Sequence, residues 1–226
     1  YAPTFGDPDE PHAGYRHSYP FSIMVNSEGK RFLDEGADFR NYTYAKYGRV
    51  VLQQPGSFAW QVFDSQVTHL LRDEYKLRGA TKDKADTLEE LCDKMKDVDF
   101  QSFLETVKEY NAAVKRDVEF DPNVKDGRNT EGLTIEKTNW ANTIEKPPFE
   151  AYSVGCGITF TFGGLKIDPP TRGQDIEDLE IPGLYAAGEL VGGLYYFNYP
   201  GSTGLMAGSV FGRIAGREAG KFSQIK

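Results

Sequence analysis

The chain has 226 residues, a length that fits one large domain or two small ones. Its net charge of −8 argues against nucleic acid and against an anionic membrane surface as partners. No apolar run reaches the ~18 residues that a membrane-spanning helix needs, and two cysteines in unrelated contexts fit a reducing, cytoplasmic location without a disulfide.

The first part of the chain combines strand signals with helix signals. Alternation of apolar residues predicts strands, and apolar stripes with a period of about 3.6 residues predict helices. In chain order, we expect strands over residues 21–26 and 57–64, a helix over residues 65–77, a short helix ending near residue 95 and a longer helix from residue 100. Thr87 and Asp99 are suited to cap the last two helices, because a side-chain oxygen at that position accepts a backbone N–H of the first turn.

Glycine indicates a boundary near residue 150. Nine of the 24 glycines lie in residues 1–150 and fifteen in residues 151–226. In the second part, an apolar strand pattern at residues 184–187 ends at Gly188, and a helix follows from about residue 202. This helix has glycine at every fourth position from 204 to 220, and each interior glycine costs about 1 kcal/mol relative to alanine. The spacing therefore indicates either close packing against another surface or a cofactor at the helix N-terminus.

Several sequence segments form a specific combination: VNSEGKRFLDE (25–35), GITFTFGGLKID (157–168), GLYAAGE (183–189), YPGSTGL (199–205) and AGSVFGRIAG (207–216). Together they resemble the flavoprotein family of fumarate reductase and succinate dehydrogenase over nearly the whole chain. DEGADFRNYTYAKYGR (34–49) and FNYPGSTGL (197–205) are most similar to its tricarballylate dehydrogenase branch. The resemblance implies an α+β fold: residues 1–150 form a substrate-capping domain with an irregular N-terminal lead-in. Residues 151–226 then form the C-terminal portion of an FAD-binding, Rossmann-like α/β domain.

The dinucleotide fingerprint of such domains, Gly-x-Gly-x-x-Gly opening a βαβ unit, is absent from the chain. We therefore expect a C-terminal piece of a longer flavoenzyme, with the missing N-terminal half of the flavoprotein as a partner. A naturally separate module is the alternative. The flavin chemistry is also compatible with a partner that accepts electrons.

The resemblance assigns the cofactor side to the glycine-rich tail. The helix near Ser202 presents backbone N–H groups and the positive end of its dipole, which suit the negative charge of reduced flavin. By resemblance, Glu189 binds the ribityl region, and Gly204 and Leu205 hold the pyrimidine edge of the ring. The expected FAD-binding residues are Thr161, Gly188, Glu189, Ser202, Gly204 and Leu205.

The substrate side departs from fumarate reductases. Phe160 stands where the family has a substrate-binding histidine, Tyr199 where it has a carboxylate-clamping arginine, and Thr68 near its catalytic arginine. The resemblance makes Tyr199, Arg40 and Glu35 the candidate catalytic residues. The candidate substrate-binding residues are Arg16, His17, Phe160 and Ser202. No metal site is expected, because His12, His17 and His69 lack ligand spacing.

Three functions remain open at this point. The first is FAD-dependent dehydrogenation of a saturated C–C bond in a small carboxylic acid, with tricarballylate to cis-aconitate as the specific candidate. The second is a ketosteroid-type dehydrogenase, in which a tyrosine before Pro-Gly polarises the substrate carbonyl, as Tyr199 could. The third is a folded, non-catalytic fragment of the flavoenzyme, and the isolated fragment is expected to be inactive.

Overall fold

The structure, a computed structural model, describes residues 16–76, 82–157 and 161–224. It consists of two compact units that divide after Gly157, and each is described by itself. This division lies beyond the boundary at residue 150, because the strand Phe149–Gly155 (β4) pairs with strands of the N-terminal unit. Phe160 lies outside the described residues.

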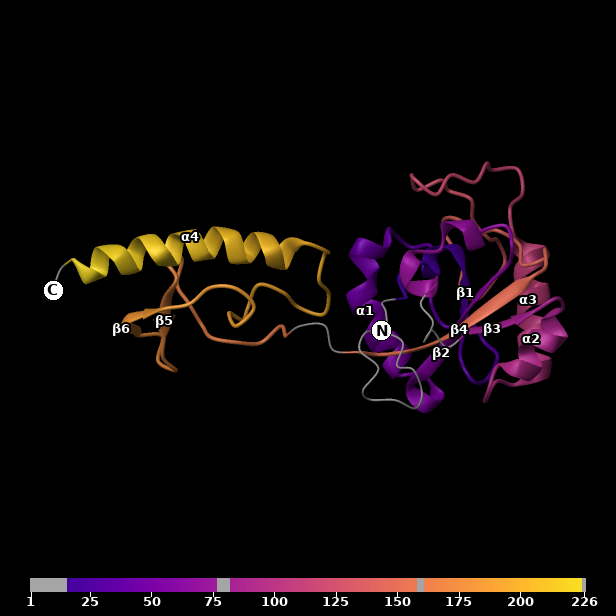
Figure 1. The fold of residues 1–226 in the computed structure, drawn as a ribbon, viewed down its shortest axis with the longest axis horizontal. Coiled ribbons are helices and arrows are strands. Elements are labelled where there is room, and N and C mark those ends of the chain that lie inside the picture. The colour runs from indigo at the N-terminus through magenta and orange to yellow at the C-terminus, as the bar shows by residue number, and fades with distance from the viewer. Residues whose placement is uncertain (1–15, 77–81, 158–160, 225–226) are drawn as a thin grey trace. The chain divides into compact units, whose positions relative to one another are not determined.

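The N-terminal unit is built on a four-stranded antiparallel sheet in the order β1-β2-β4-β3 (Figure 1). The other three strands are β1 (Ile23–Val25), β2 (Phe58–Phe63) and β3 (Lys82–Ala85). The strands predicted over residues 21–26 and 57–64 are therefore confirmed as β1 and β2. Since all described pairings in this sheet are antiparallel, the unit mixes helices with antiparallel strands.

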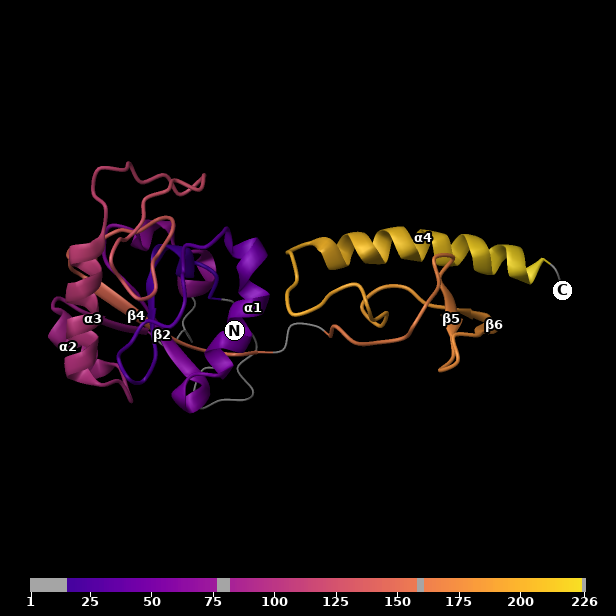
Figure 2. The same ribbon diagram turned by 180° about the vertical axis from the view of Figure 1, so that it is seen from behind.

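The two faces of this sheet are covered by different helices. Along β2, Trp60 and Val62 join one apolar cluster and Ala59 joins another, as the period-two alternation of a strand requires. The helices α2 (Leu88–Lys94) and α3 (Phe100–Ala113) cover the first face, and α1 (Arg40–Leu52) covers the second. Figures 1 and 2 show α1 on the opposite side of the sheet from α2 and α3.

Local capping chemistry forms α2 and α3 as predicted. The Thr87 hydroxyl accepts the N–H of Glu90 at 3.2 Å, and the Asp99 carboxylate accepts the N–H of Ser102 at 2.8 Å. The helix predicted over residues 65–77 is wrong. That segment forms two short 3₁₀ turns, η3 (Thr68–Leu70) and η4 (Asp73–Lys76), and residue 77 lies outside the described part.

The C-terminal unit contains a two-stranded antiparallel sheet and one long helix. These elements are β5 (Arg172–Gln174), β6 (Glu180–Tyr185) and α4 (Thr203–Ser223). The helix predicted from the glycine-rich tail is confirmed, and the Phe222 ring at its end lies 6.5 Å from the ring of Tyr185. The described part of the chain has three buried apolar clusters, and all of them belong to the N-terminal unit. The C-terminal unit instead exposes large apolar side chains, such as Leu205 and Tyr196, which are 75% and 81% exposed.

Candidate flavin and substrate sites

A cavity of about 230 Å³ lies at the N-terminal end of α4 in the C-terminal unit. Its lining residues are Thr161, Gly188, Glu189, Val191, Leu194, Tyr195, Tyr199, Gly204 and Ala207. Four of the six predicted FAD-binding residues therefore line one cavity. Ser202 lies directly before α4, and Leu205 is in its first turn with a largely exposed side chain.

Glu189 is held across this cavity by a backbone contact. One carboxylate oxygen accepts the N–H of Thr161 at 3.0 Å, and this bond joins the turn after β6 to the segment that contains Thr161. Gly188 makes the turn possible, because its φ of +84° lies in the left-handed region that side chains disfavour. The same carboxylate can accept further hydrogen bonds, since an ionised carboxylate has about four acceptor positions.

Tyr199 caps the N-terminus of α4. Its phenol oxygen accepts the N–H of Gly204 at 2.8 Å, and its ring packs edge-on against Tyr195 with centroids 4.9 Å apart. Ser202 adopts a left-handed φ of 74° and its side chain makes no capping hydrogen bond. The phenol of Tyr199 therefore accepts one of the N–H groups at the start of α4 that the sequence analysis assigned to the cofactor.

The regularly spaced glycines of α4 fall into two groups. A Cβ at Gly204 would lie 2.7 Å from the Tyr199 hydroxyl, and one at Gly208 would lie 4.0 Å from the Cα of Gly188. At Gly212, Gly216 and Gly220 no described atom lies within 4 Å of such a Cβ. Close packing therefore explains the glycines of α4 that lie at the cavity. It does not explain Gly212, Gly216 and Gly220, where no described residue packs closely.

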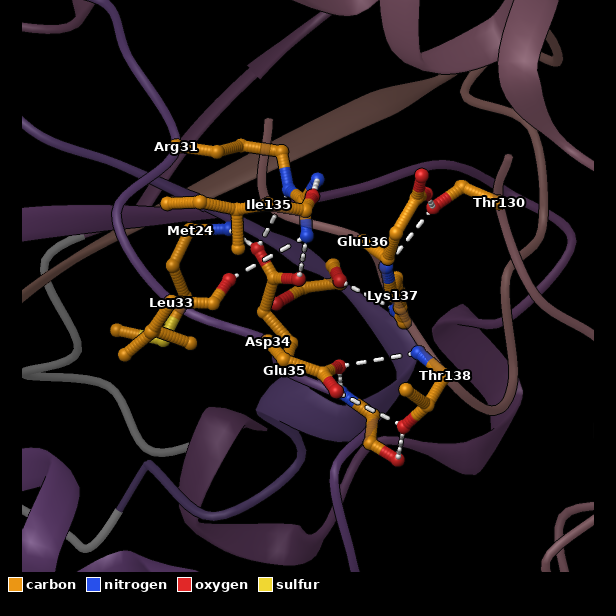
Figure 3. Close-up of polar contacts among 12 residues, drawn as sticks. Met24, Arg31, Leu33, Asp34, Glu35, Thr130, Ile135, Glu136, Lys137 and Thr138 are labelled. Carbon is orange, nitrogen blue, oxygen red and sulfur yellow. Dashed lines mark hydrogen bonds and ion pairs between the residues drawn. The ribbon is translucent and has the colours of Figure 1, made fainter. Parts of the chain in front are cut away.

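In the N-terminal unit, Glu35 is fully buried in an ionic cluster (Figure 3). Arg31 forms an ion pair with it at 2.6 Å, and the backbone N–H of Met24 donates to it at 2.7 Å. Because β1 is an edge strand, this carboxylate accepts an N–H that another strand would otherwise accept. The contacts of Glu35 thus hold β1 and Arg31 in place, and Arg40 is not among them.

The same cluster anchors the segment after α3 (Figure 3). The Lys137 ammonium is buried and donates to the Ser22 carbonyl at 2.6 Å. Asp34 accepts the hydroxyl of Thr138 at 2.8 Å and its N–H at 3.1 Å. Burial lowers the pKa of Lys137 to about 8, against a partial offset from the charge of Glu35.

Arg40 and His17 line a second cavity, of about 240 Å³, within the N-terminal unit. The full lining is His17, Ser18, Pro20, Phe21, Phe39, Arg40, Asn41, Leu70, Arg72, Pro122 and Trp140. Burial is the largest cause that lowers the pKa of His17 to about 3, and nearby positive charges, those of Arg40 and Arg72 among them, act in the same direction. Burial and then the charge of Arg72 lower the pKa of Arg40 as well. Arg72 was missed by the sequence analysis, because no motif marks it and only the tertiary fold brings it to Arg40.

Arg16 lies beside this cavity without lining it. Its guanidinium donates to the Glu74 carbonyl at 2.7 Å and lies 5.2 Å from the ring centroid of Tyr75. These contacts are of a kind that holds the chain in place, and the assignment of Arg16 to substrate stays a prediction.

Comparison with known families decides the class of protein. A family model described as the FAD binding domain matches residues 7–205. The chain belongs to this family. The predicted cofactor, FAD, is therefore confirmed at the level of the family.

The similar proteins are flavin oxidoreductases. The chain is 33% identical over 205 residues to a fumarate reductase (cytochrome) from Shewanella frigidimarina, covering 90% of this chain and 32% of the relative. It is 30% identical over 220 residues to a 3-oxosteroid 1-dehydrogenase from Mycolicibacterium smegmatis, covering 87% and 37% respectively. Among solved structures, the open conformation of a flavocytochrome c3 fumarate reductase matches with a TM-score of 0.64 and 29% identity, over 92% of this chain and 34% of that chain. The chain spans about a third of the length of these relatives.

The residues at the α4 cavity fit part of FAD. The cavity offers a carboxylate for hydroxyl groups, aromatic side chains for a flat ring and a helix N-terminus for negative charge. Its volume is below the ~300–1,000 Å³ of typical small-molecule sites, so it would form one wall of a larger site. No helix in the described ranges combines the length and apolar character needed to cross a membrane.

Proposed function

We propose that the flavoprotein to which this chain contributes is an FAD-dependent oxidoreductase that acts on a C–C bond of a small carboxylic acid. Dehydrogenation of tricarballylate to cis-aconitate is the specific candidate. The observation that carries the proposal is the cavity at α4, where Glu189, bonded to Thr161, faces the capped helix N-terminus. Relatives named fumarate reductase, NADH:acrylate oxidoreductase and urocanate reductase support a carboxylic acid as the substrate class.

Each side chain has a proposed task. FAD, when bound, supplies the hydride acceptor for the reaction. Glu189 holds the ribityl hydroxyls, and the N-terminus of α4 stabilises negative charge at the ring. Arg40 and Arg72 bind substrate carboxylate, because guanidinium groups match carboxylate geometry. Tyr199, fixed by Gly204, donates its hydroxyl proton as a hydrogen bond to a substrate oxygen.

The steroid alternative rests on Tyr199. The 30% identity to a 3-oxosteroid 1-dehydrogenase and the fixed phenol beside Gly204 both favour it. That function would need Tyr199 strongly and Arg40 little, since a neutral ketone offers no charge to an arginine. In the non-catalytic alternative, neither residue would affect turnover.

We further propose that the missing N-terminal half of the flavoprotein covers the C-terminal unit. The exposed apolar side chains of this unit and the open face of α4 at Gly212, Gly216 and Gly220 support that arrangement. A cytoplasmic location and a separate electron acceptor stay predictions.

The test is to combine this chain with the N-terminal half and FAD, and then to measure flavin absorbance and turnover with an artificial electron acceptor. Tricarballylate, fumarate (assayed with reduced dye) and a 3-ketosteroid are the three substrates to compare. Turnover of a carboxylic acid with a bound yellow flavin is the expected result. Turnover of the ketosteroid alone would establish the alternative, and a colourless complex that turns over none of the three would leave only the non-catalytic fragment.

A further inference from the structure

The side chain of Arg40 is placed by the backbone from which it extends. Its guanidinium makes no hydrogen bond or ion pair with the described residues of the chain. Arg40 is the first residue of α1, and Phe39, at the N-cap position, makes no side-chain capping bond. The Tyr19 hydroxyl lies 3.4 Å from the Arg40 carbonyl oxygen, which is long for a hydrogen bond between two oxygen atoms. The contacts that fix the chain just before Arg40 therefore decide where its side chain lies.

A segment far away in the sequence holds the loop between Glu35 and α1. The side-chain amide of Asn139 donates to the Gly36 carbonyl at 2.8 Å, although the two residues are 103 positions apart. The Thr138 hydroxyl lies 3.0 Å from the same carbonyl oxygen and 2.8 Å from a carboxylate oxygen of Asp34, and Figure 3 shows the bond to Asp34. Asn139 is only 6% exposed, so water competes little for its bond to Gly36.

The two segments also touch through their backbones. A Cβ at Gly36 would lie 2.1 Å from the Asn139 carbonyl oxygen, so a side chain at position 36 would force one of the two backbones to move. Three residues further along, the Phe39 ring packs against the Trp140 ring with centroids 5.3 Å apart. The loop is therefore held at Gly36 and again at Phe39, directly before Arg40.

Asn139 also joins this loop to the segment that follows α3. Its side-chain oxygen accepts the N–H of Gly127 at 3.0 Å, so both polar atoms of the amide group are engaged on opposite sides. The indole N–H of the neighbouring Trp140 donates to the Val124 carbonyl at 2.8 Å. Trp140 and Arg40 line the same cavity, so one hydrogen-bonded network fixes a wall of the cavity together with the start of α1.

We propose that Asn139, together with Thr138, is a positioning residue for the reaction: their bonds to Gly36 hold the start of α1 where Arg40 lines the cavity. This inference rests on the proposed function, in which Arg40 binds a substrate carboxylate. Neither Asn139 nor Thr138 is among the residues that line the cavity, so both act through Arg40. A misplacement of about 1 Å in a binding group can cost about 100-fold in rate, which makes the anchoring of this loop important for the reaction.

The experiment uses the complete flavoprotein loaded with FAD, with tricarballylate and with fumarate (assayed with reduced dye). Asn139→Asp is the test variant: it keeps the acceptor for Gly127 and places a carboxylate oxygen against the Gly36 carbonyl. Asn142→Asp is the matched control, because the described bond of Asn142 is made by its backbone and the residue does not line the cavity. Both variants are also made in an Arg40→Gln background, and this double-variant cycle shows whether Asn139 acts through Arg40.

We expect Asn139→Asp to lower kcat/KM by about 10- to 100-fold, mainly through KM, and Asn142→Asp to leave it unchanged. In the Arg40→Gln background the Asn139 change should cost less than about twofold, because the arginine through which it acts is gone. A purely structural residue would instead reduce the active fraction by the same factor in both backgrounds. Amide hydrogen exchange over residues 36–42, followed by mass spectrometry, should be faster in Asn139→Asp and unchanged in Asn142→Asp.

Equal losses in the two backgrounds, or wild-type kinetics in Asn139→Asp, would overturn this inference, while a loss in Arg40→Gln alone would still support the proposed role of Arg40. Wild-type kinetics in Arg40→Gln, or no turnover of either acid, would contradict the proposed function, and the inference would fall with it. If Asn139→Asp fails to fold, Thr138→Val replaces it in the same cycle, since it removes the hydroxyl bonds to the loop from an exposed position.

Discussion

The phenol oxygen of Tyr199 lies 2.8 Å from the backbone nitrogen of Gly204, close enough that a Cβ at position 204 would lie 2.7 Å from that oxygen. Tyr199 is itself buried, so its ring has little freedom to move aside. The contact therefore links a glycine that looks unfavourable in a helix to the aromatic residue that the sequence placed in the active site. It also explains how α4 begins without a capping side chain at Ser202.

Replacing Gly204 with alanine should disturb this end of α4. We expect Gly204→Ala to destabilise the C-terminal unit by about 1–3 kcal/mol, the usual cost of overpacking a tight site. Gly212→Ala is the matched control and should stabilise the helix by up to about 1 kcal/mol, because no described atom lies near its Cβ. In urea denaturation, far-UV circular dichroism reports α4 together with α1, α2 and α3, whereas the fluorescence of both tryptophans, Trp60 and Trp140, reports the N-terminal unit alone, so the difference between the two transitions reports α4. Equal stability of the two variants would contradict the proposed role of the contact.

Replacing Glu189 should weaken flavin binding in the complete protein. Glu189 is exposed in this structure, and FAD would cover it on binding; loss of a charge-assisted hydrogen bond covered in this way costs about 1–3 kcal/mol, or roughly 5- to 150-fold in affinity. Glu189→Ala is the test variant, and Glu180→Ala, at the exposed start of β6, controls for loss of a carboxylate. Flavin retained after gel filtration, measured by absorbance, gives the result. Wild-type occupancy in Glu189→Ala would remove this residue from the cofactor site.

Lys137 should make the stability of the N-terminal unit depend on pH. Its folded pKa of about 8 lies below the value of about 10.4 for an unfolded lysine, so the unfolded state binds more protons between these two values. Unfolding free energy should therefore increase from pH 8 to pH 10, by up to about 2–3 kcal/mol relative to Lys137→Met. Tryptophan fluorescence in urea at pH 7, 8, 9 and 10 measures this difference. A wild-type curve parallel to that of Lys137→Met would show that Lys137 does not contribute to it.

Local chemistry in the sequence predicts part of this fold well. Thr87 and Asp99 cap their helices as expected, because capping involves only residues three positions apart. The segment at 65–77 fails for the opposite reason: tertiary contacts such as the N–H of Arg72 on the Ser18 hydroxyl, at 3.2 Å, replace helical hydrogen bonds. The helix α1 was not predicted, and Phe39 at its N-terminus makes no capping contact.

The candidate sites show the same division. Thr161, Gly188, Glu189 and Gly204, predicted to bind FAD, line one cavity. The last three lie close together in sequence, in the glycine-rich turn and the start of α4. The cavity at Arg40 was found only in part, because Arg72 and Trp140 reach it through the fold of the whole N-terminal unit. The carboxylate of Glu35 was assigned to catalysis by motif, while the structure places it in the ion pair with Arg31.

The substrate class can be decided by comparing two variants in the complete flavoprotein. Losing a desolvated charge pair with a substrate carboxylate costs about 2–5 kcal/mol, or roughly 30- to several-thousand-fold in kcat/KM. On tricarballylate we expect Arg40→Gln to show this loss, and Tyr199→Phe a milder one, because the phenol only donates a hydrogen bond. Arg49→Gln, another arginine of α1 that does not line the cavity, is the control for loss of charge. On a ketosteroid the order should reverse, with Tyr199 dominant and Arg40 nearly silent. Steady-state kinetics of all three variants on both substrates therefore separates the two enzyme functions, and a near-total loss in Tyr199→Phe on tricarballylate would show that the phenol is the base instead of a hydrogen-bond donor.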